Sequence, residues 1–200
     1  MNDITLDLIT QKLSAAEKSA LDSDGYAEIE IQADTKLRSA AVLLPLTYFQ
    51  NEWHILYTRR TDRVESHKGQ VSFPGGASEE GETTPEETAL REVHEEIGVS
   101  PTDVQIIGRL SNMITISKYR VSPIVGVIPF PYAFKIQNIE VARVFTIPLV
   151  WLANKNNYWE FSLNDSNRTL IAYHPFDGEL LWGATARMTV NFLKTLELIS

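Results

Sequence analysis

The stretch KGQVSFPGGASEEGETTPEETALREVHEEIGVS, residues 68–100, is the most informative part of this chain. Between Gly76 and Gly98 it gathers eight glutamates and a single arginine, in a protein whose formal net charge is -8. Like charges that lie together repel one another, and a positive partner relieves the repulsion. This composition predicts that the segment holds a cation.

A helix is expected to begin directly after Thr84. This residue can accept a hydrogen bond as the N-cap, and Pro85 suits the first helical position, where its missing N–H is not needed. Two glutamates follow in the first turn, where the helix dipole favours them. Gly98 stands where a left-handed residue often ends a helix. These signals predict a helix between Thr84 and Gly98.

The predicted helix has two distinct faces. Apolar side chains recur at spacings of three and four on the face that packs on the core: Leu90, Val93 and Ile97. Carboxylates recur at the same spacings on another face: Glu92, Glu95 and Glu96. Such a face is often only solvated, but here an FPGG loop precedes the helix and its Glu82 can reach back to the same point. Oxygen ligands of this kind suit Mg²⁺ or Mn²⁺, so we expect a metal site.

Composition narrows the class of protein. The chain has 200 residues, 44% of them hydrophobic, and no cysteine, which excludes a disulfide framework and cysteine-ligated zinc. The first ten residues, MNDITLDLIT, lack the basic start of a secretory signal, and no apolar run approaches the roughly 18 to 20 residues of a bilayer span. We therefore expect a cytoplasmic protein without a membrane partner. The negative net charge argues against a nucleic acid partner.

The remaining sequence pattern indicates strands around a few helices. Amphipathic helices are expected at 4–21 and 183–199. Residues 38–49 and 52–60 predict a hairpin that turns at Gln50 and Asn51. Further strands, or pieces of strand and turn, are expected in 104–112, 119–130 and 141–152, and a late hairpin in 158–163 and 169–175. This order predicts an α+β fold, an α/β/α sandwich in which helices flank a mixed β-sheet. A helical extension at 1–35 would pack on one domain at 36–200.

The segment from Gly76 to Val99 resembles the Nudix box, the signature of hydrolases that act on a nucleoside diphosphate linked to another moiety. The fixed residue types of that pattern occur at these positions: Gly76, Glu82, Arg91, Glu92, Val93, Glu95, Glu96, Gly98 and Val99. The gap between Glu82 and Arg91 is one residue longer than in the general pattern. The resemblance implies a Nudix-like fold and metal-dependent hydrolysis of a pyrophosphate bond.

The residues before the box narrow the resemblance to the coenzyme A pyrophosphatase branch of the family. That branch shares the longer gap, and its motif resembles ILYTRRTDRVESHKGQVSFPGG, residues 55–76. Two positions differ, because Thr61 stands where the branch has a serine and Glu65 where it has a second arginine. Later phrases of the branch recur in residues 122–130 and 180–188. The resemblance implies that coenzyme A, or its acyl or oxidised derivatives, is the substrate.

The resemblance also implies roles for the acidic residues. A divalent cation, Mg²⁺ or Mn²⁺, would be held by the helix and by the loop before it: Glu92, Glu95, Glu96, the carbonyl of Gly76, and Glu82. Arg91 would orient a glutamate through a charge-assisted hydrogen bond. The general base stays open between the helix, through Glu92 or Glu96, and a later loop, through Glu140.

Basic residues before the box are candidate contacts for the phosphates of a nucleotide: Arg60, Arg63, His67 and Lys68. A solvated basic loop is the alternative. Because of Glu65, another nucleoside diphosphate derivative such as ADP-ribose or NADH stays open as the substrate. A non-catalytic binding module of the same fold is a third interpretation, and the complete set of glutamates argues against it. The sequence also leaves a homodimer open.

Overall fold

The computed structural model describes residues 4–20, 26–27, 35–63, 67–162 and 169–199. Within these residues the helices are α1 (Leu6–Ala20), α2 (Pro85–Ile97), α3 (Leu149–Leu152) and α4 (Gly183–Thr195). The main sheet contains nine strands: β1 (Tyr26–Ala27), β2 (Arg38–Phe49), β3 (Glu52–Arg60), β4 (Val71–Ser72), β5 (Gly75–Ala77), β6 (Gln105–Arg109), β7 (Met113–Ile114), β8 (Tyr119–Val127) and β9 (Val141–Pro148). A separate hairpin consists of β10 (Tyr158–Ser162) and β11 (Thr169–Tyr173).

The main sheet is mixed and is built around β2 and β3. Strand β2 runs parallel to β8 and antiparallel to β3, and β9 pairs antiparallel with β3 on its other side. The hairpin between β2 and β3 turns at Gln50 and Asn51, whose φ angles are 53° and 63°. Positive angles at both positions suit a tight two-residue turn between twisted strands. The predicted hairpin is confirmed.

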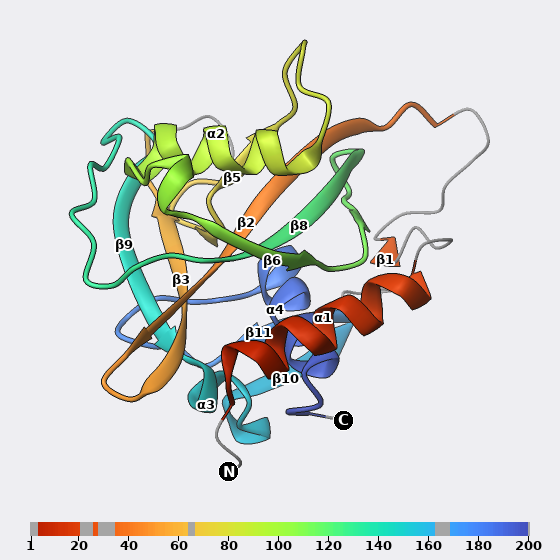
Figure 1. Cartoon of the computed structure of the whole chain (residues 1–200), viewed down its shortest axis with the longest axis vertical. Coiled ribbons are helices and arrows are strands. Elements are labelled where there is room, and N and C mark those ends of the chain that lie inside the picture. Colours follow the sequence, from red (N-terminus) through yellow and green to blue (C-terminus); the bar gives the residue numbers. More distant parts are fainter. Residues whose placement is uncertain (1–3, 21–25, 28–34, 64–66, 163–168, 200) are drawn as a thin grey trace.

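Apolar residues of β2 alternate between the two faces of the sheet, as the two-residue period of a strand requires. Ala41 and Leu43 belong to a buried cluster with Val93 of α2. Leu44 and Leu46 belong to a second buried cluster that contains residues of α1 and α4. Figure 1 shows α2 on one side of the sheet and α1 and α4 on the other. The predicted α/β/α sandwich is therefore confirmed.

Helix α2 is fixed at both ends by the predicted caps. The backbone N–H of Glu87 donates to Thr84 Oγ1 at 3.3 Å, and the N–H of Thr84 donates to Glu87 Oε2 at 3.1 Å. This reciprocal pair is a capping box. At the other end Gly98 has a φ angle of 72°, and an added Cβ would lie 2.6 Å from Lys135 Cβ. Because both ends are fixed, the glutamates of α2 keep a constant position on the sheet.

The structure differs from the sequence pattern after β9 and at Glu96. The range 141–152 is not strand throughout, because β9 ends at Pro148 and a helical turn, α3, follows it. Leu149 and Leu152 are buried on this turn, and a short apolar run of this kind does not distinguish strand from helix by sequence. Glu96 does not fit the alternative of a solvated face, since only 4% of it is exposed and it is one of the buried residues of α2.

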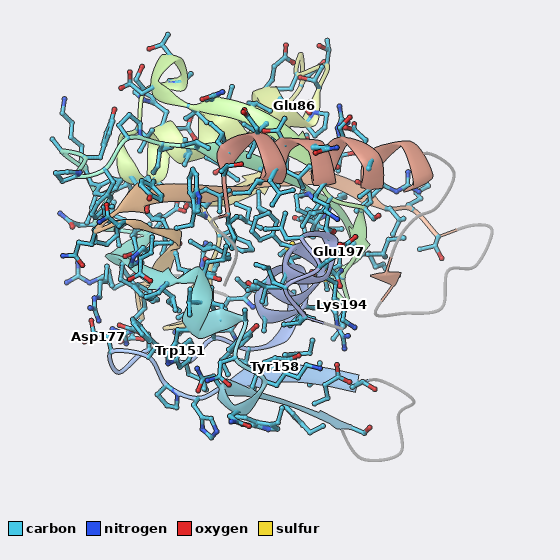
Figure 2. The ribbon with its side chains drawn as sticks, turned by 60° about the horizontal axis from the view of Figure 1, so that its bottom comes forward. Glu86, Trp151, Tyr158, Asp177, Lys194 and Glu197 are labelled. Atoms are coloured by element: carbon cyan, nitrogen blue, oxygen red, sulfur yellow. The ribbon has the colours of Figure 1, made fainter. Side chains whose placement is uncertain are left out.

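The hairpin of β10 and β11 lies far from α2. Figure 2 shows Glu86, in the first turn of α2, and Tyr158, at the start of β10, on opposite sides of the molecule. The second cluster separates them, with Tyr173 of β11 fully buried in it. No helix in the described part of the chain is both long and apolar enough to span a membrane.

Candidate active site

Arg91 is the centre of an acidic network at the outer side of α2. Its Nε donates to Glu82 Oε1 at 2.8 Å, and its Nη1 donates to Glu92 Oε1 at 2.9 Å and Glu95 Oε2 at 3.0 Å. Its Nη2 donates to the carbonyl of Ala77 at 3.0 Å. One guanidinium group thus joins three carboxylates and the backbone of β5. Charge-assisted bonds of this kind fix orientation as well as adding energy.

Glu82 is held by donors on both of its carboxylate oxygens. Besides the bond from Arg91, its Oε2 accepts from the hydroxyl of Thr88 and from the backbone N–H of Glu79, each at 2.7 Å. The bond from Arg91 is the main cause that lowers the pKa of Glu82 to about 2. Glu82 is therefore a fixed negative charge at neutral pH.

Glu92 lies directly against the backbone of β5. An added Cβ at Gly76 would lie 2.3 Å from Glu92 Oε1, so only a glycine leaves room for this carboxylate. Burial raises the pKa of Glu92, the bonds from Arg91 oppose the rise, and the charges of Glu95 and Glu140 add to it. Burial is therefore the dominant influence on this carboxylate, although Arg91 is bonded to it.

Glu96 is the most deeply buried carboxylate of the helix. Its Oε2 has no hydrogen-bond partner within the described residues, and its Oε1 lies 3.9 Å from Nη1 of Arg60. Burial is the first cause that raises the pKa of Glu96 to about 8, and the charge of Glu92 is the second. The charge of Arg60 and a hydrogen bond from the backbone N–H of Gly75 to this carboxyl group oppose the rise. Arg60 has its own buried Nε without a partner among these residues. An unpaired buried polar atom is costly, and a ligand that pairs with it removes that cost.

Glu140 reaches the same region from a different part of the chain. The loop before β9 is tied to the end of α2, because the N–H of Gln137 donates to the carbonyl of Glu96 at 2.9 Å. It is tied to the end of β3 as well, because the N–H of Thr61 donates to the carbonyl of Glu140 at 2.8 Å. Glu140 lies close enough that its charge raises the pKa values of Glu92 and Glu96.

The donor chemistry of this region fits a divalent cation. The side chains of Glu92, Glu96 and Glu140 offer oxygen atoms alone, and one oxygen of Glu96 is buried without a partner, as described above. Within the described residues, however, no three acidic or histidine side chains converge closely enough to hold a metal ion as they stand. Glu95 is 56% exposed, and its carboxylate accepts from Arg91. The three carboxylates of the helix therefore do not all point to one place.

The basic residues before the box occupy two different environments. Arg60 is partly buried beside Glu96, whereas Arg63, His67 and Lys68 are exposed on the loop that follows β3. His67 contacts a neighbour on the same loop, since its Nδ1 lies 2.8 Å from Oε1 of Gln70. The structure thus brings Arg60 to the glutamates and leaves the other three at the surface. Residue 65 lies outside the described residues.

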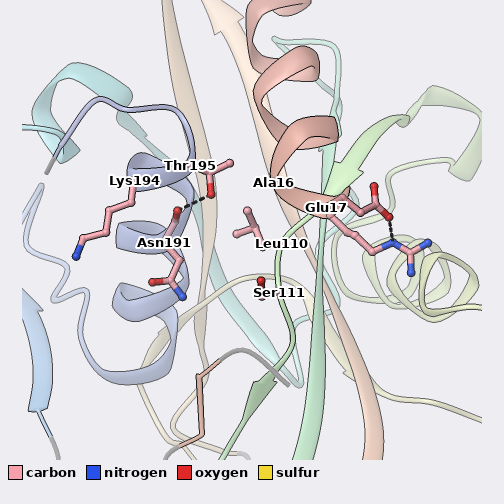
Figure 3. Close-up of a pocket in the computed structure, with 8 residues that line it drawn as sticks. Ala16, Glu17, Leu110, Ser111, Asn191, Lys194 and Thr195 are labelled. Atoms are coloured by element: carbon pink, nitrogen blue, oxygen red, sulfur yellow. Dashed lines mark hydrogen bonds and ion pairs between the residues drawn. The ribbon is translucent and has the colours of Figure 1, made fainter. Parts of the chain in front are cut away.

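Surface cavities lie elsewhere on the molecule. One lies between α1 and α4 and is lined by Glu17, Leu110, Ser111, Asn191 and Lys194 among others (Figure 3). Figure 3 also marks the ion pair that Glu17 makes with Arg109 on this cavity's rim. Another is an apolar groove on the outer face of the β10–β11 hairpin. Neither contains a residue predicted for the site.

Comparison with known proteins identifies the family. Residues 36–142 match the family profile described as the NUDIX domain, which is more than half of the chain. The chain therefore belongs to the Nudix family. It is a Nudix hydrolase, a pyrophosphohydrolase of a nucleoside diphosphate derivative, and enzymes of this family generally use divalent metal cations.

Relatives agree with the family assignment, and a solved structure shares the fold. The Nudix hydrolase NudL of Escherichia coli O6:H1 is 34% identical over 152 residues, which cover 74% of this chain and 78% of the relative. NudL of Yersinia enterocolitica is 34% identical over 150 residues, which cover 74% of this chain and 75% of the relative. A MutT/nudix family protein from Enterococcus faecalis has the same fold, with a TM-score of 0.55 and 13% identity over 85% of this chain and 66% of that chain.

Proposed function

We propose that this enzyme hydrolyses the pyrophosphate bond of coenzyme A, or of its acyl or oxidised derivatives, to 3',5'-ADP and a 4'-phosphopantetheine product. The substrate assignment rests on residues 55–76, which resemble the coenzyme A pyrophosphatase branch. The exposed Arg63 and Lys68 supply positive charge for the phosphates, including the 3'-phosphate of the adenosine, and His67 lies on the same loop. The non-catalytic alternative is not retained, because the family match and relatives that are named as Nudix hydrolases both support an enzyme.

We further propose that Mg²⁺ or Mn²⁺ is held by Glu92 and Glu96 with the carbonyl of Gly76, and that Glu82 supports them. Glu95 joins these ligands when it exchanges its bond with Arg91 for the cation. The observation that carries this proposal is the buried Glu96 Oε2 without a partner in the described residues, next to Glu92. A bound divalent cation neutralises charge on the phosphate oxygens and makes a water molecule easier to deprotonate.

The residues of the chain then have separate tasks. Arg91 orients Glu92 through the bond to its Oε1. Arg60, beside Glu96, is placed to contact a negatively charged phosphate oxygen. Glu140 is the general base in this proposal: its carboxylate accepts the proton of the attacking water, because Glu92 and Glu96 serve as ligands.

A substrate panel tests the function. The purified protein with Mg²⁺ or Mn²⁺ is given coenzyme A, dephospho-coenzyme A, ADP-ribose, NADH and a nucleoside triphosphate, and the products are identified by mass. The proposal predicts 3',5'-ADP, with coenzyme A cleaved faster than its dephosphorylated form. Faster cleavage of ADP-ribose or NADH would overturn the assignment of coenzyme A as the substrate. It would still agree with hydrolysis of a nucleoside diphosphate derivative.

A further inference from the structure

Thr61 is a buried polar residue at the end of β3, and its hydroxyl joins two segments. The hydroxyl donates to the carbonyl of Ile139 at 2.6 Å and accepts from the backbone N–H of Arg63 at 3.3 Å. Only 8% of Thr61 is exposed. Because a hydroxyl has one hydrogen to donate, the short bond to Ile139 defines its orientation. The segment with Glu140 and the basic loop with Arg63 therefore share one anchor.

A β-bulge explains how Thr61 comes to this position. The pairing of β3 with β9 shifts between Arg59, which faces Arg143, and Arg60, which faces Val141. Bulges bend a strand and redirect the side chains beside them, and they are frequent next to active sites. After the bulge the backbone of Thr61 pairs with Glu140 instead of continuing the regular ladder. The bulge thus lies directly before Arg60, which pairs with Glu96, and Thr61, which anchors the Glu140 loop.

Gln137 fixes the same loop from the other side. Its side-chain Oε1 accepts from the N–H of Ile139 at 2.7 Å and from the N–H of Glu140 at 3.2 Å. The carbonyl of Gln137 also accepts from the N–H of Glu140 at 3.1 Å. The backbone of Ile139 and Glu140 is therefore held on its N–H groups by Gln137 and on its carbonyls by Thr61.

We infer that Thr61 and Gln137 are positioning residues that hold Glu140 in its working orientation, and that Thr61 couples this orientation to the basic loop. The inference rests on the proposed role of Glu140 as the base. The exposed side chain of Ile139 supports it, since at 67% exposure this side chain adds little apolar packing beside Glu140. The hydrogen bonds of Thr61 and Gln137 hold the backbone at this position. A displacement of about 1 Å at a catalytic group can lower turnover by roughly 100-fold.

A double-mutant cycle tests the inference with the panel substrate that is cleaved fastest. Thr61→Val removes the hydroxyl and keeps the shape, and it should lower kcat by roughly 10- to 100-fold. Thr61→Ser keeps the hydroxyl and should stay within about twofold of the wild type. In a Glu140→Gln background Thr61→Val should change kcat by less than about twofold, because the group that it positions is already lost.

A matched control and a second variant keep the test decisive. Thr58 is a buried threonine on the same strand, and its hydroxyl donates to the carbonyl of Ser72 at 3.2 Å, away from the Glu140 loop. Any effect of Thr58→Val on kcat should be equal in the wild-type and Glu140→Gln backgrounds. If Thr61→Val does not fold, Gln137→Met takes its place. This variant should lower kcat by the same factor in the wild type and should change kcat by less than about twofold in the Glu140→Gln background.

The outcomes separate this inference from the proposed function. Full turnover by Thr61→Val and Gln137→Met, with a large loss in Glu140→Gln, would overturn the positioning role and leave Glu140 as the base. An equal loss of kcat from Thr61→Val in both backgrounds would overturn it too, because an effect that is independent of Glu140 lowers kcat by the same factor whether or not Glu140 is present. Wild-type turnover by Glu140→Gln would overturn the role of Glu140 and the inference with it.

Discussion

Arg91 Nε lies 2.8 Å from Glu82 Oε1 and joins helix α2 to the loop in front of it. The bond spans the gap that is one residue longer here than in the general Nudix pattern. The longer gap therefore does not prevent Glu82 from reaching the acidic network. The same guanidinium also contacts Glu92, so the position of a proposed ligand depends on it.

Replacement of Arg91 by alanine should destabilise the protein. The change leaves three carboxylates without their shared cation, and we expect a loss of about 2 kcal/mol in the free energy of unfolding. Arg91→Lys keeps the charge but not the planar fork, so it should recover only part of this loss. Urea unfolding in EDTA measures both variants. Unchanged stability of Arg91→Ala would show that the network contributes nothing to the fold.

The contact between Gly76 and Glu92 gives a second prediction. Gly76→Ala places a Cβ 2.3 Å from Glu92 Oε1, so the carboxylate must move. We expect a loss of stability of roughly 1 to 3 kcal/mol and a lower turnover. In a Glu92→Ala background the clash disappears, and Gly76→Ala should then cost little stability. An equal cost in both backgrounds, measured by thermal unfolding, would rule out this contact as the cause.

Glu96 should stabilise the protein less than a neutral residue of the same shape when metal is removed. Its carboxylate is buried, and one oxygen has no partner in the described part of the chain. In EDTA, Glu96→Gln should raise the free energy of unfolding by on the order of 1 kcal/mol. Glu80→Gln, at an exposed position, is the control and should change little. Lower stability of Glu96→Gln in EDTA would contradict this prediction.

His54, near the turn between β2 and β3, should make the stability of the protein depend on pH. Burial lowers its pKa, and Glu52 opposes the shift. A histidine with a lowered pKa binds fewer protons in the folded than in the unfolded state near pH 6.5, so stability falls as the pH drops below that value. His54→Phe keeps a ring beside Phe49 and should weaken this dependence between pH 7.5 and 5.5. The free energy of unfolding is measured by urea unfolding at each pH. The same change with pH in the wild type and in His54→Phe would refute the prediction.

Much of the fold is local enough to be predicted from the sequence. The capping box at Thr84 and the left-handed Gly98 are each determined by a few neighbouring residues. The turn at Gln50 and Asn51 follows from two apolar runs with a polar pair between them. The two faces of the sheet follow from the unbroken apolar run of β2, which predicts burial on both sides.

The site was less predictable because it depends on tertiary contacts. The helical period places Glu96 with Glu92 and Glu95, but the sheet behind α2 determines that Glu96 is buried beside Arg60. No sequence pattern predicts a role for Thr61 or Gln137. Thr61 donates to a residue 78 positions away in the chain, and the side chain of Gln137 accepts from the backbone of its own turn. The branch motif includes the position of Thr61 but predicts no role for it.

Metal binding tests the central claim most directly. The free Mn²⁺ signal is titrated by electron paramagnetic resonance with the wild type, Glu92→Gln, Glu96→Gln and the control Glu80→Gln. The account predicts that the wild type and Glu80→Gln bind Mn²⁺ equally, and that Glu92→Gln and Glu96→Gln bind it roughly tenfold more weakly or worse. Equal affinity in all four proteins would contradict the assignment of these glutamates as the ligands of the cation.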